Sequence, residues 1–303
     1  MISGLHIEPT NICTLKCPAC SRTQFIEQWP QHWRNHSLDT DQLLNFLDID
    51  LTGMPVILCG NYGDPIYHPD FIDLVNGLKQ RGAKLTIVTN GSYRKVEWWQ
   101  ALVEKLDAQD SVEFSVDGTP DNFTQYRVNA DWPSIKQAMQ VCAQATCHSV
   151  WKFIPFKFNQ DTIQQAKELS AELGIKEFKV KLSDRFDEAT ADLKPDDSLL
   201  RDRYQSMIEW KTTKQTAGVD ALCDSGNMHY ISADGHYTPC CYVAEHRFYY
   251  KTPFGKYKNE YSIAQTHISQ ILAQPAVVEF YQQLEQHTVC QYNCPKLVST
   301  NLT

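Results

Sequence analysis

The sequence predicts an α/β protein: a partial (β/α)6, TIM-like barrel followed by a small C-terminal domain. Apolar runs rich in β-branched and aromatic residues alternate with segments of helical period between residues 5 and 181, which is typical of βαβ units in a parallel sheet. Six such runs are found, fewer than the eight strands of a closed barrel. The alternation ends near residue 182, where charged residues and proline replace the apolar periodicity.

The six strands are expected where short apolar runs stop at polar or glycine-containing residues: 4–8, 56–59, 84–89, 111–116, 149–155 and 177–181. Helices are expected between them, where apolar residues recur every three or four positions: 40–47, 69–80, 95–106, 132–145 and 159–173. Gly174 stands where a glycine commonly ends such a helix.

The rest of the chain is expected to form a second unit. Residues 183–205 begin with a stretch of Asp, Glu, Lys and Pro without apolar periodicity, which predicts a solvated linker. Two short β runs flank Asp234-Gly235 within residues 230–239, a strong hairpin signal, and a closing helix is expected over 269–285. We therefore expect a barrel domain over 1–182, a linker over 183–205 and a second domain over 206–303.

Composition narrows the class of protein. The apolar share of 42% and charged share of 21% are those of a globular protein, and no apolar run is long enough for a membrane span. The first residues lack the features of a signal peptide, so we expect a cytoplasmic location. A net charge of −8 argues against broad nucleic-acid binding, which needs a basic surface.

Eleven cysteines in a reducing compartment indicate metal or cluster binding rather than disulfides. Cys13, Cys17 and Cys20 follow the first expected strand with spacing C-x3-C-x2-C, and thiolates are the ligands that iron–sulfur clusters prefer. Three thiolates would leave one iron of a cubane open to another ligand. The alternative is a structural zinc site in a zinc-stabilised binding module, which would need a fourth ligand. Three histidines lie near enough in sequence to keep it open: His6, His32 and His36.

The run from Glu8 to Cys20 resembles the entry loop of radical S-adenosylmethionine (SAM) enzymes. The resemblance implies a [4Fe–4S] cluster on Cys13, Cys17 and Cys20, whose open iron is chelated by the methionine part of SAM. In that family the residue before the third cysteine is often aromatic and lies near the adenine. Ala19 stands here instead, so packing on the adenine would fall to Trp151 and Phe153.

The resemblance extends along the predicted barrel. Gly60-Asn61-Tyr62-Gly63-Asp64-Pro65 stands where the family has a glycine-rich turn that holds the amino group of the methionine. The ends of the next two strands also match positions that contact the cofactor. By resemblance, the cofactor-binding residues would be Gly63, Asp64, Asn90, Ser115, Asp117 and Arg127, with Arg127 paired to the methionine carboxylate. The alternatives are ordinary turn chemistry for the strand-end residues and a surface charge for Arg127.

The C-terminal cysteines resemble those of the auxiliary-cluster domains called SPASM and twitch. With nine residues after Cys294, the count favours one closed auxiliary [4Fe–4S] cluster in a shortened, twitch-like domain, held by Cys223, Cys240, Cys290 and Cys294. Cys241 could replace Cys240, pack in the core, or donate a hydrogen atom to a substrate radical. Three other cysteines have no partner at metal spacing and are read as structural: Cys59, Cys142 and Cys147.

The resemblance implies an activity. An electron donor such as flavodoxin or ferredoxin would reduce the first cluster, SAM would be cleaved to a 5′-deoxyadenosyl radical, and that radical would abstract a hydrogen from a peptide or a polar small molecule. The auxiliary cluster would assist an oxidation or other modification of the substrate. The sequence singles out no catalytic residue that acts on the substrate. The alternative is an iron–sulfur electron-transfer or sensing protein that does not cleave SAM, against which the glycine turn and the strand-end polar residues count.

Overall fold

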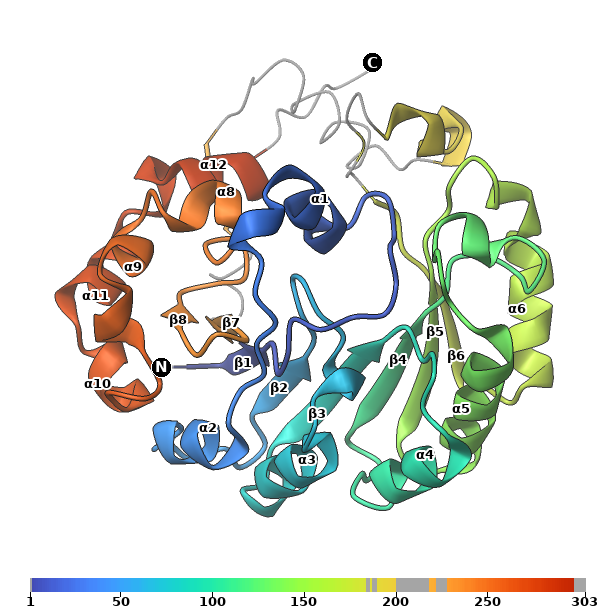
Figure 1. Ribbon diagram of the computed structural model, residues 1–303, viewed down its shortest axis with the longest axis horizontal. Helices are drawn as coiled ribbons and strands as arrows, with labels where there is room; N and C mark the ends of the chain where they lie inside the picture. Colours follow the sequence, from blue (N-terminus) through green and yellow to red (C-terminus); the bar gives the residue numbers. More distant parts are fainter. Residues whose placement is uncertain (1, 184–185, 187–189, 200–217, 222–227, 297–303) are drawn as a thin grey trace.

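The computed structural model describes residues 2–183, 186, 190–199, 218–221 and 228–296. Its centre is one curved sheet whose strands run side by side, with helices lining its outer side (Figure 1). The strand order is β6-β5-β4-β3-β2-β1-β7-β8. The strands are β1 (Gly4–Ile7), β2 (Pro55–Leu58), β3 (Lys84–Thr89), β4 (Ser111–Ser115), β5 (His148–Phe153), β6 (Glu177–Val180), β7 (Met228–Ile231) and β8 (Tyr237–Thr238).

The open α/β barrel predicted from the sequence is confirmed. Strands β1 to β6 pair in parallel in chain order, each in register with the next. The sheet then extends further than expected, because β7 pairs in parallel with the other edge of β1 and β8 returns beside β7 as an antiparallel hairpin. The hairpin predicted for a separate domain therefore belongs to the same sheet as the barrel strands.

The helices between the barrel strands are α2 (Thr40–Phe46), α3 (Phe71–Gln80), α4 (Val96–Val103), α5 (Trp132–Gln144) and α6 (Ile163–Glu172). Local sequence explains their ends. Asp39 accepts a hydrogen bond from Gln42 N at 2.8 Å, and Asp131 accepts one from Ser134 N at 2.9 Å, so each carboxylate caps a helix start. Gly174, at φ +77°, follows α6 as expected.

The C-terminal residues form short helices: α8 (His246–Tyr249), α9 (Pro253–Lys256), α10 (Ile268–Leu272), α11 (Pro275–Gln282) and α12 (Thr288–Asn293). The single helix predicted over 269–285 is wrong. Its first part is α10, and a new helix begins at Pro275, which has no N–H to continue the preceding helix. The helix α1 (Ser21–Gln28), which follows the three cysteines, was not predicted; among its residues none is buried.

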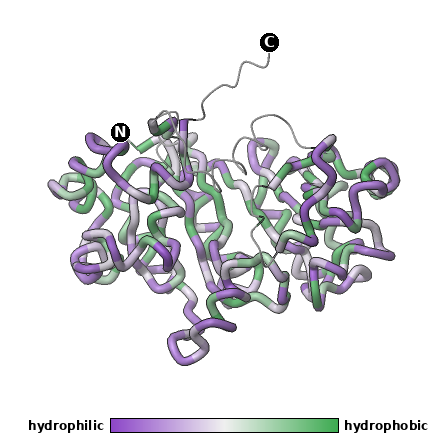
Figure 2. The backbone as a smooth tube through the Cα atoms, turned by 90° about the horizontal axis from the view of Figure 1, so that it is seen from above, coloured by the Kyte–Doolittle hydropathy of each residue, from purple (hydrophilic) through white to green (hydrophobic). Residues whose placement is uncertain are grey.

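The main core lies between the outer face of the sheet and the helices. It contains alternate strand residues such as Leu5, Ile7, Val56 and Leu58, together with the buried side of α3. Seen from above, hydrophobic segments run through the strands while the outer helices and loops are mostly hydrophilic (Figure 2). The intervening strand residues, such as His6, Glu113 and Lys152, turn to the inner face. No helix in the described ranges is long and apolar enough to cross a membrane.

The linker expected at 183–205 is described only in part. It contains two 3-10 turns, Ala191–Leu193 and Asp197–Leu199. Lys157 N donates to Leu193 O at 3.1 Å, which ties this segment to the loop after β5. The division of the chain at residues 182 and 206 stays a prediction.

Candidate active site

The three N-terminal cysteines lie on a loop that leaves β1 and crosses the carboxyl end of the sheet (Figure 1). Backbone contacts hold the loop on both sides. Asp64 N donates to Ile12 O at 3.0 Å, and Lys16 N donates to Val128 O at 3.1 Å. The side chain of Asn11 bonds to the segment before α2, accepting from His36 N at 2.8 Å. The loop is thus fixed by three parts of the chain before any cofactor is considered.

Cys13, Cys17 and Cys20 gather in one small apolar cluster with Leu15, Ala19, Tyr126 and Phe156. Burial raises the pKa of Cys13 to about 12 and that of Cys17 to about 11, and the neighbouring cysteines add to both increases. If all three sulfurs were deprotonated, they would repel one another in this apolar cluster unless a positive charge stood between them. A cubane iron–sulfur cluster with three thiolate ligands meets that requirement, so the donor set fits this group.

A single metal ion fits the loop less well. Within the ranges that the structure describes, no three His, Cys, Asp or Glu side chains converge on one point where an ion could bind. His6, one of the histidines considered for zinc, lies on β1 with Nε2 at 2.9 Å from Cys59 O, and burial lowers its pKa to about 4. The backbone of His36 braces the loop, while its side chain is exposed.

The turn after β2 packs directly on the cysteine loop. A Cβ atom on Gly63 would lie 1.9 Å from Thr10 O, so only glycine fits. The Glu8 carboxylate accepts from Tyr62 N at 2.7 Å and Gly63 N at 3.0 Å, and its other oxygen accepts from Tyr230 Oη at 2.7 Å. Glu8 therefore joins the turn to β7.

Asp64 organises the end of β3. Its carboxylate accepts from Thr89 Oγ1 at 2.8 Å and from Asn90 N at 2.6 Å and Nδ2 at 2.5 Å. Burial raises the pKa of Asp64 to about 6 despite these hydrogen bonds. Asn90 Nδ2 in turn lies 3.7 Å from Cys13 Sγ, within reach of a hydrogen bond to sulfur. Asp64 thus reaches the cysteines through Asn90.

Asp117 and Arg127 form a buried ion pair beside Cys17. Arg127 Nε donates to Asp117 Oδ2 at 2.7 Å, and the other Asp117 oxygen accepts from Ile154 N at 2.8 Å. The side chain of Asp117 is fully buried and holds Arg127, whereas the resemblance placed Asp117 among the cofactor-binding residues. The charge of the guanidinium lowers the pKa of the Cys17 thiol against the effect of burial. Arg127 is not a surface charge.

Ser115 ends β4 on the inner face of the sheet. It is in register with Lys152 of β5 and partly exposed. Lys152 forms an ion pair with Glu113, two residues before Ser115. The inner face beneath the loop is therefore polar, with Ser115 at its upper edge.

Trp151 and Phe153 do not line this site, which corrects the expectation that they pack on the adenine. Both are fully buried on the outer face of the sheet, where Trp151 contacts Trp132 of α5 at a ring distance of 6.0 Å. Trp151 also donates to Val116 O at 2.8 Å. Side chains alternate along a strand, so Lys152 between them faces inward instead.

Sequence reasoning missed the two rings that do pack on the cysteine loop. Tyr126 and Phe156 lie with their ring centroids 4.2 Å apart, and both belong to the cluster around Cys17. Both follow strand ends, Tyr126 after β4 and Phe156 after β5. Their position after a strand, like that of Asn90, was the available signal.

A second ring cluster joins the N-terminal helix to the C-terminal part of the chain. Phe25 of α1 and Trp29, directly after α1, contact His246 of α8 at ring distances of 5.1 and 5.2 Å. Tyr62 Oη accepts from His246 N at 2.9 Å. The helix α1 is thereby held against the residues that follow the C-terminal hairpin.

The C-terminal cysteines are brought together in part. Burial raises the pKa of Cys240 well above its usual value, and Cys241 and Cys290 contribute to the increase. Cys294 N donates to Cys290 O at 2.8 Å at the end of α12, and Asp220 N donates to Cys294 O at 2.8 Å. Cys223, the fourth expected ligand, lies outside the described residues.

Cys240 and Cys241 are both close to other ionisable groups. Cys241 and Cys290 add to the raised pKa of Cys240, and Cys241 adds to the raised pKa of Cys59 and of Tyr230. Burial raises the pKa of Cys59 to about 12. Of the remaining cysteines read as structural, Cys142 and Cys147 are fully buried in the main core.

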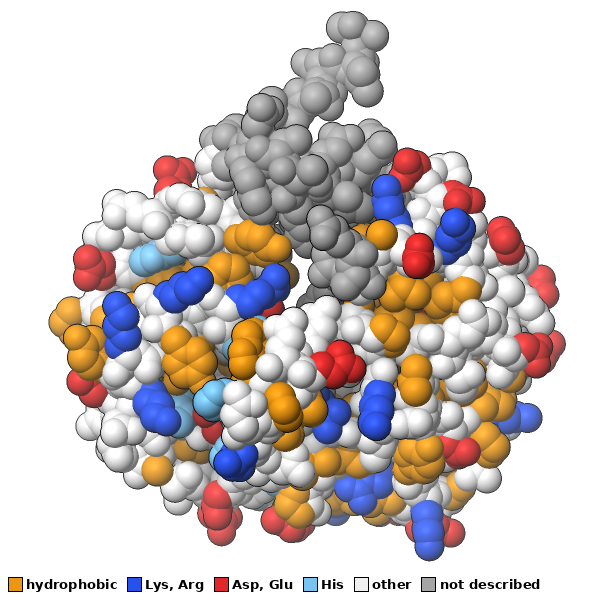
Figure 3. Space-filling view, turned by 45° about the horizontal axis from the view of Figure 1, so that its top comes forward, with side chains coloured by type: hydrophobic (Ala, Val, Ile, Leu, Met, Phe, Trp, Pro, Cys, Tyr) orange, Lys and Arg blue, Asp and Glu red, His pale blue; other side chains and the backbone are white. Residues whose placement is uncertain are grey.

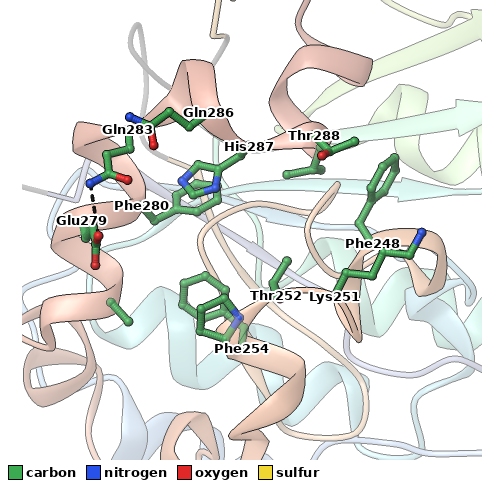
Figure 4. Close-up of a pocket in the computed structure, with 13 residues that line it drawn as sticks. Phe248, Lys251, Thr252, Phe254, Glu279, Phe280, Gln283, Gln286, His287 and Thr288 are labelled. Carbon is green, nitrogen blue, oxygen red and sulfur yellow. Dashed lines mark hydrogen bonds between the residues drawn. The ribbon is translucent and has the colours of Figure 1, made fainter.

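A separate cavity of about 450 Å³ lies among α8, α9, α11 and α12. Phe254, Phe280 and His287 line it, with His287 stacked on Phe280 at 4.4 Å, and Lys251 and Glu279 stand at its sides (Figure 4). On the face shown in Figure 3, acidic and basic side chains both stand among hydrophobic ones.

Comparison with known proteins gives a consistent picture. Residues 7–172, more than half of the chain, match the profile of the radical SAM superfamily. The chain is similar to the tungsten-containing aldehyde ferredoxin oxidoreductase cofactor-modifying protein of Pyrococcus furiosus, with 36% identity over 121 residues, 38% of this chain and 31% of that protein. It is also similar to the PqqA peptide cyclase of Ruegeria pomeroyi, with 24% identity over 183 residues, 57% of this chain and 45% of that protein. The chain therefore matches less than half of the length of either relative.

Among solved structures, the fold is similar to that of SuiB from Streptococcus suis. The SAM-bound form has a TM-score of 0.57 at 14% identity and is matched over 96% of this chain and 77% of that one. The form bound to the precursor peptide SuiA has a TM-score of 0.60 at 12% identity, over 96% and 71%. At this identity the likeness concerns the fold.

Proposed function

The chain belongs to the radical SAM superfamily, whose members use a [4Fe–4S] cluster and SAM, and we propose on this basis that it abstracts a hydrogen atom from its substrate after reductive cleavage of SAM. The observation that carries the proposal is the gathering of Cys13, Cys17 and Cys20 in one buried cluster between the polar ends of β3 and β4. When bound, the cluster and SAM together supply a reactive 5′-deoxyadenosyl radical.

In this proposal, residues of the chain bind the cluster and orient the cofactor. Cys13, Cys17 and Cys20 hold the cluster, and Gly63 lets the turn after β2 lie against their loop. Asn90, Ser115 and Arg127 are the polar groups proposed to meet the cofactor, while Asp64 and Asp117 fix Asn90 and Arg127 in place. Tyr126 and Phe156 exclude water from the cysteine side.

We further propose one auxiliary [4Fe–4S] cluster on Cys223, Cys240, Cys290 and Cys294. The interaction of Cys240 with Cys290 and the short turn from Cys290 to Cys294 support this set. The set uses Cys240, whose pKa is raised in part by Cys290, with Cys241 as the alternative ligand at this position. Its role would be to exchange an electron with the substrate.

The proposed substrate is a peptide or a polar small molecule, with a peptide as the first class to test. One relative is named as a peptide cyclase, and SuiB was solved with its precursor peptide. The other relative is named as a cofactor-modifying protein, which keeps the small molecule in view. The polar inner face around Lys152 and Glu113 suits either class. Flavodoxin or ferredoxin is the proposed electron donor.

The test is anaerobic reconstitution with iron and sulfide, followed by reduction with dithionite in the presence of SAM. We expect 5′-deoxyadenosine and methionine to form. The triple variant C13A/C17A/C20A should form none and should retain about half of the iron, because the auxiliary cluster stays. Cleavage by this variant would contradict the assignment of the three cysteines. A wild-type protein that holds both clusters and cleaves no SAM would instead be an electron-transfer protein.

A further inference from the structure

Arg127 occupies an unusual position for a cation. It follows a 3-10 turn, Phe123–Gln125, in the loop after β4, yet only 16% of its side chain is exposed. Asp117 Oδ2 accepts a hydrogen bond from Arg127 Nε at 2.7 Å, and Asp117 Oδ1 accepts one from Ile154 N at 2.8 Å. The next residue along the loop is tied to the cysteine loop as well, since Val128 O accepts a hydrogen bond from Lys16 N at 3.1 Å.

This anchoring sets the direction of the guanidinium. A guanidinium has five N–H groups in a rigid plane, so fixing Nε also fixes where the terminal nitrogens point. Here the Arg127 Cζ atom lies 5.5 Å from the centre of the Tyr126 ring, and Tyr126 packs in the same cluster as Cys17. The guanidinium is close enough for its charge to lower the pKa of the Cys17 thiol. Because a guanidinium does not lose its proton in proteins, its charge beside Cys17 is permanent.

A permanent cation next to one ligand affects the cluster that the ligand holds. Hydrogen bonds to cluster sulfurs and nearby charges are among the factors that set reduction potentials. Reduction adds a negative charge, which a neighbouring cation stabilises, so the potential rises. Groups that orient a ligand also affect how well the metal is held. The effect is large only where water is excluded, as it is around Cys17.

We propose that Arg127 is a positioning residue for the first cluster, pinned by Asp117 so that its guanidinium orients the Cys17 thiolate and raises the reduction potential of the cluster. The proposal rests on the proposed function only in assigning a cluster to Cys13, Cys17 and Cys20. It is separate from the expected pairing of Arg127 with the carboxylate of SAM, because it holds when SAM is absent.

The test is a redox titration of the full-length, reconstituted protein, followed by electron paramagnetic resonance without SAM. The signal that changes on later addition of SAM identifies the first cluster. For R127Q we expect a tenfold smaller ratio of reduced to oxidised cluster at a fixed potential, which is a midpoint lower by about 59 mV for one electron. R127K, which keeps the charge but loses the planar fork, should fall between R127Q and wild type. The matched control is K16Q, which removes an exposed charge from the cysteine loop itself.

A second variant covers the case in which R127Q does not fold, because it leaves the buried Asp117 charge unpaired. D117N/R127Q removes both charges and should also lower the potential, because the Arg127 charge affects Cys17 more strongly than the opposite Asp117 charge does. The proposal is overturned if the folded Arg127 variants change the midpoint potential by no more than K16Q does. This holds even if their affinity for SAM falls. A wild-type protein that assembles no SAM-responsive cluster would overturn the proposed function instead.

Discussion

Single residues with no chemistry of their own hold the cysteine loop in place. Gly63 touches the loop backbone, Glu8 ties the turn to β7, and Asn11 bonds to the segment before α2. Each of these contacts joins parts of the chain that are distant in sequence. The positions of the three thiols therefore depend on neighbours that a search for ligands would overlook.

Substitution of Gly63 should displace the loop. In G63A the new methyl group would meet Thr10 O at 1.9 Å, a backbone atom that cannot turn aside. We expect a loss of stability of about 2 kcal/mol and several-fold less iron in the first cluster. Thermal unfolding of the apoprotein and iron content after reconstitution measure the two effects.

The control is G77A in α3, where the added methyl group meets the flexible end of the Leu44 side chain of α2. This variant should keep its iron and nearly its full stability. Equal iron content in G63A and wild type would show that the loop tolerates the shift.

The hydrogen bond from Tyr230 to the Glu8 carboxylate is buried, so its loss should destabilise the protein more than the loss of an exposed one. Y230F removes one donor from a buried carboxylate and raises the pKa of Glu8 further, because burial already raises it. We expect a loss of about 1–3 kcal/mol in unfolding free energy near neutral pH. The comparison is Y93F. The Tyr93 hydroxyl donates to a backbone carbonyl, Asn129 O, and the residue is 52% exposed. Equal losses in the two variants would contradict the role given to burial.

At this scale the sequence predicted which strand ends carry the site, but not every side chain that points to it. Asn90, Ser115 and Arg127 follow strands and do lie at the carboxyl end of the sheet. The prediction for Trp151 and Phe153 was wrong because a shift of one position along a strand moves a side chain to the other face of the sheet. The apolar run of β5 does not show which of its residues face inward. Asp117 follows β4 as predicted, but its ion pair with Arg127 was not predicted.

At the scale of elements, strands were predicted more closely than helices. The ends of β3 were predicted to the residue because a short apolar run between polar residues marks them. The helix α1 buries none of its residues and so had no apolar period to reveal it. Its place is set instead by rings, through the contacts of Phe25 and Trp29 with His246.

Strand β7 carries a histidine that should make the apoprotein sensitive to acid. Burial lowers the pKa of His229 from 6.5 to about 4, so between these values the unfolded chain binds a proton that the folded protein does not. Stability should therefore fall as the pH is lowered from about 6.5 to about 4, by about 3 kcal/mol from this residue. H229Q should show a shallower decline of unfolding temperature over that window.

In H229Q, part of the loss of stability at low pH should remain, because His6 also has a pKa of about 4 in the folded protein. The control is H32Q, which changes an exposed histidine and should leave the pH profile as in wild type. A profile for H229Q that runs parallel to wild type would show that His229 is not the source.

At the scale of the whole molecule, the chain was predicted as two units and its strands form one sheet. Composition marked the change near residue 182, but pairing of β7 with β1 is a long-range contact that no local pattern reveals. The cysteines at the two ends of the chain are consequently parts of one continuous structure.

Removing auxiliary ligands should separate the two proposed clusters. In C240S/C290S we expect iron to fall from about eight to about four atoms per chain, with cleavage of SAM retained and modification of the substrate lost. C142S changes a buried cysteine outside both sets and should keep its iron. Full iron content in C240S/C290S would contradict the auxiliary assignment.

The pairing of β1 with β7 also determines when β1 gains its second neighbouring strand during synthesis. Glu8 and Tyr230, which meet across these strands, are 222 residues apart, so β1 leaves the ribosome long before its second neighbour exists. Until then one edge of β1 presents unpaired backbone groups, which invite association with other chains. The closing contact also has a high sequence separation, which slows folding. The nascent protein should therefore depend on chaperones until residue 231 has emerged, and a strand that mimics β7 should bind it in that interval.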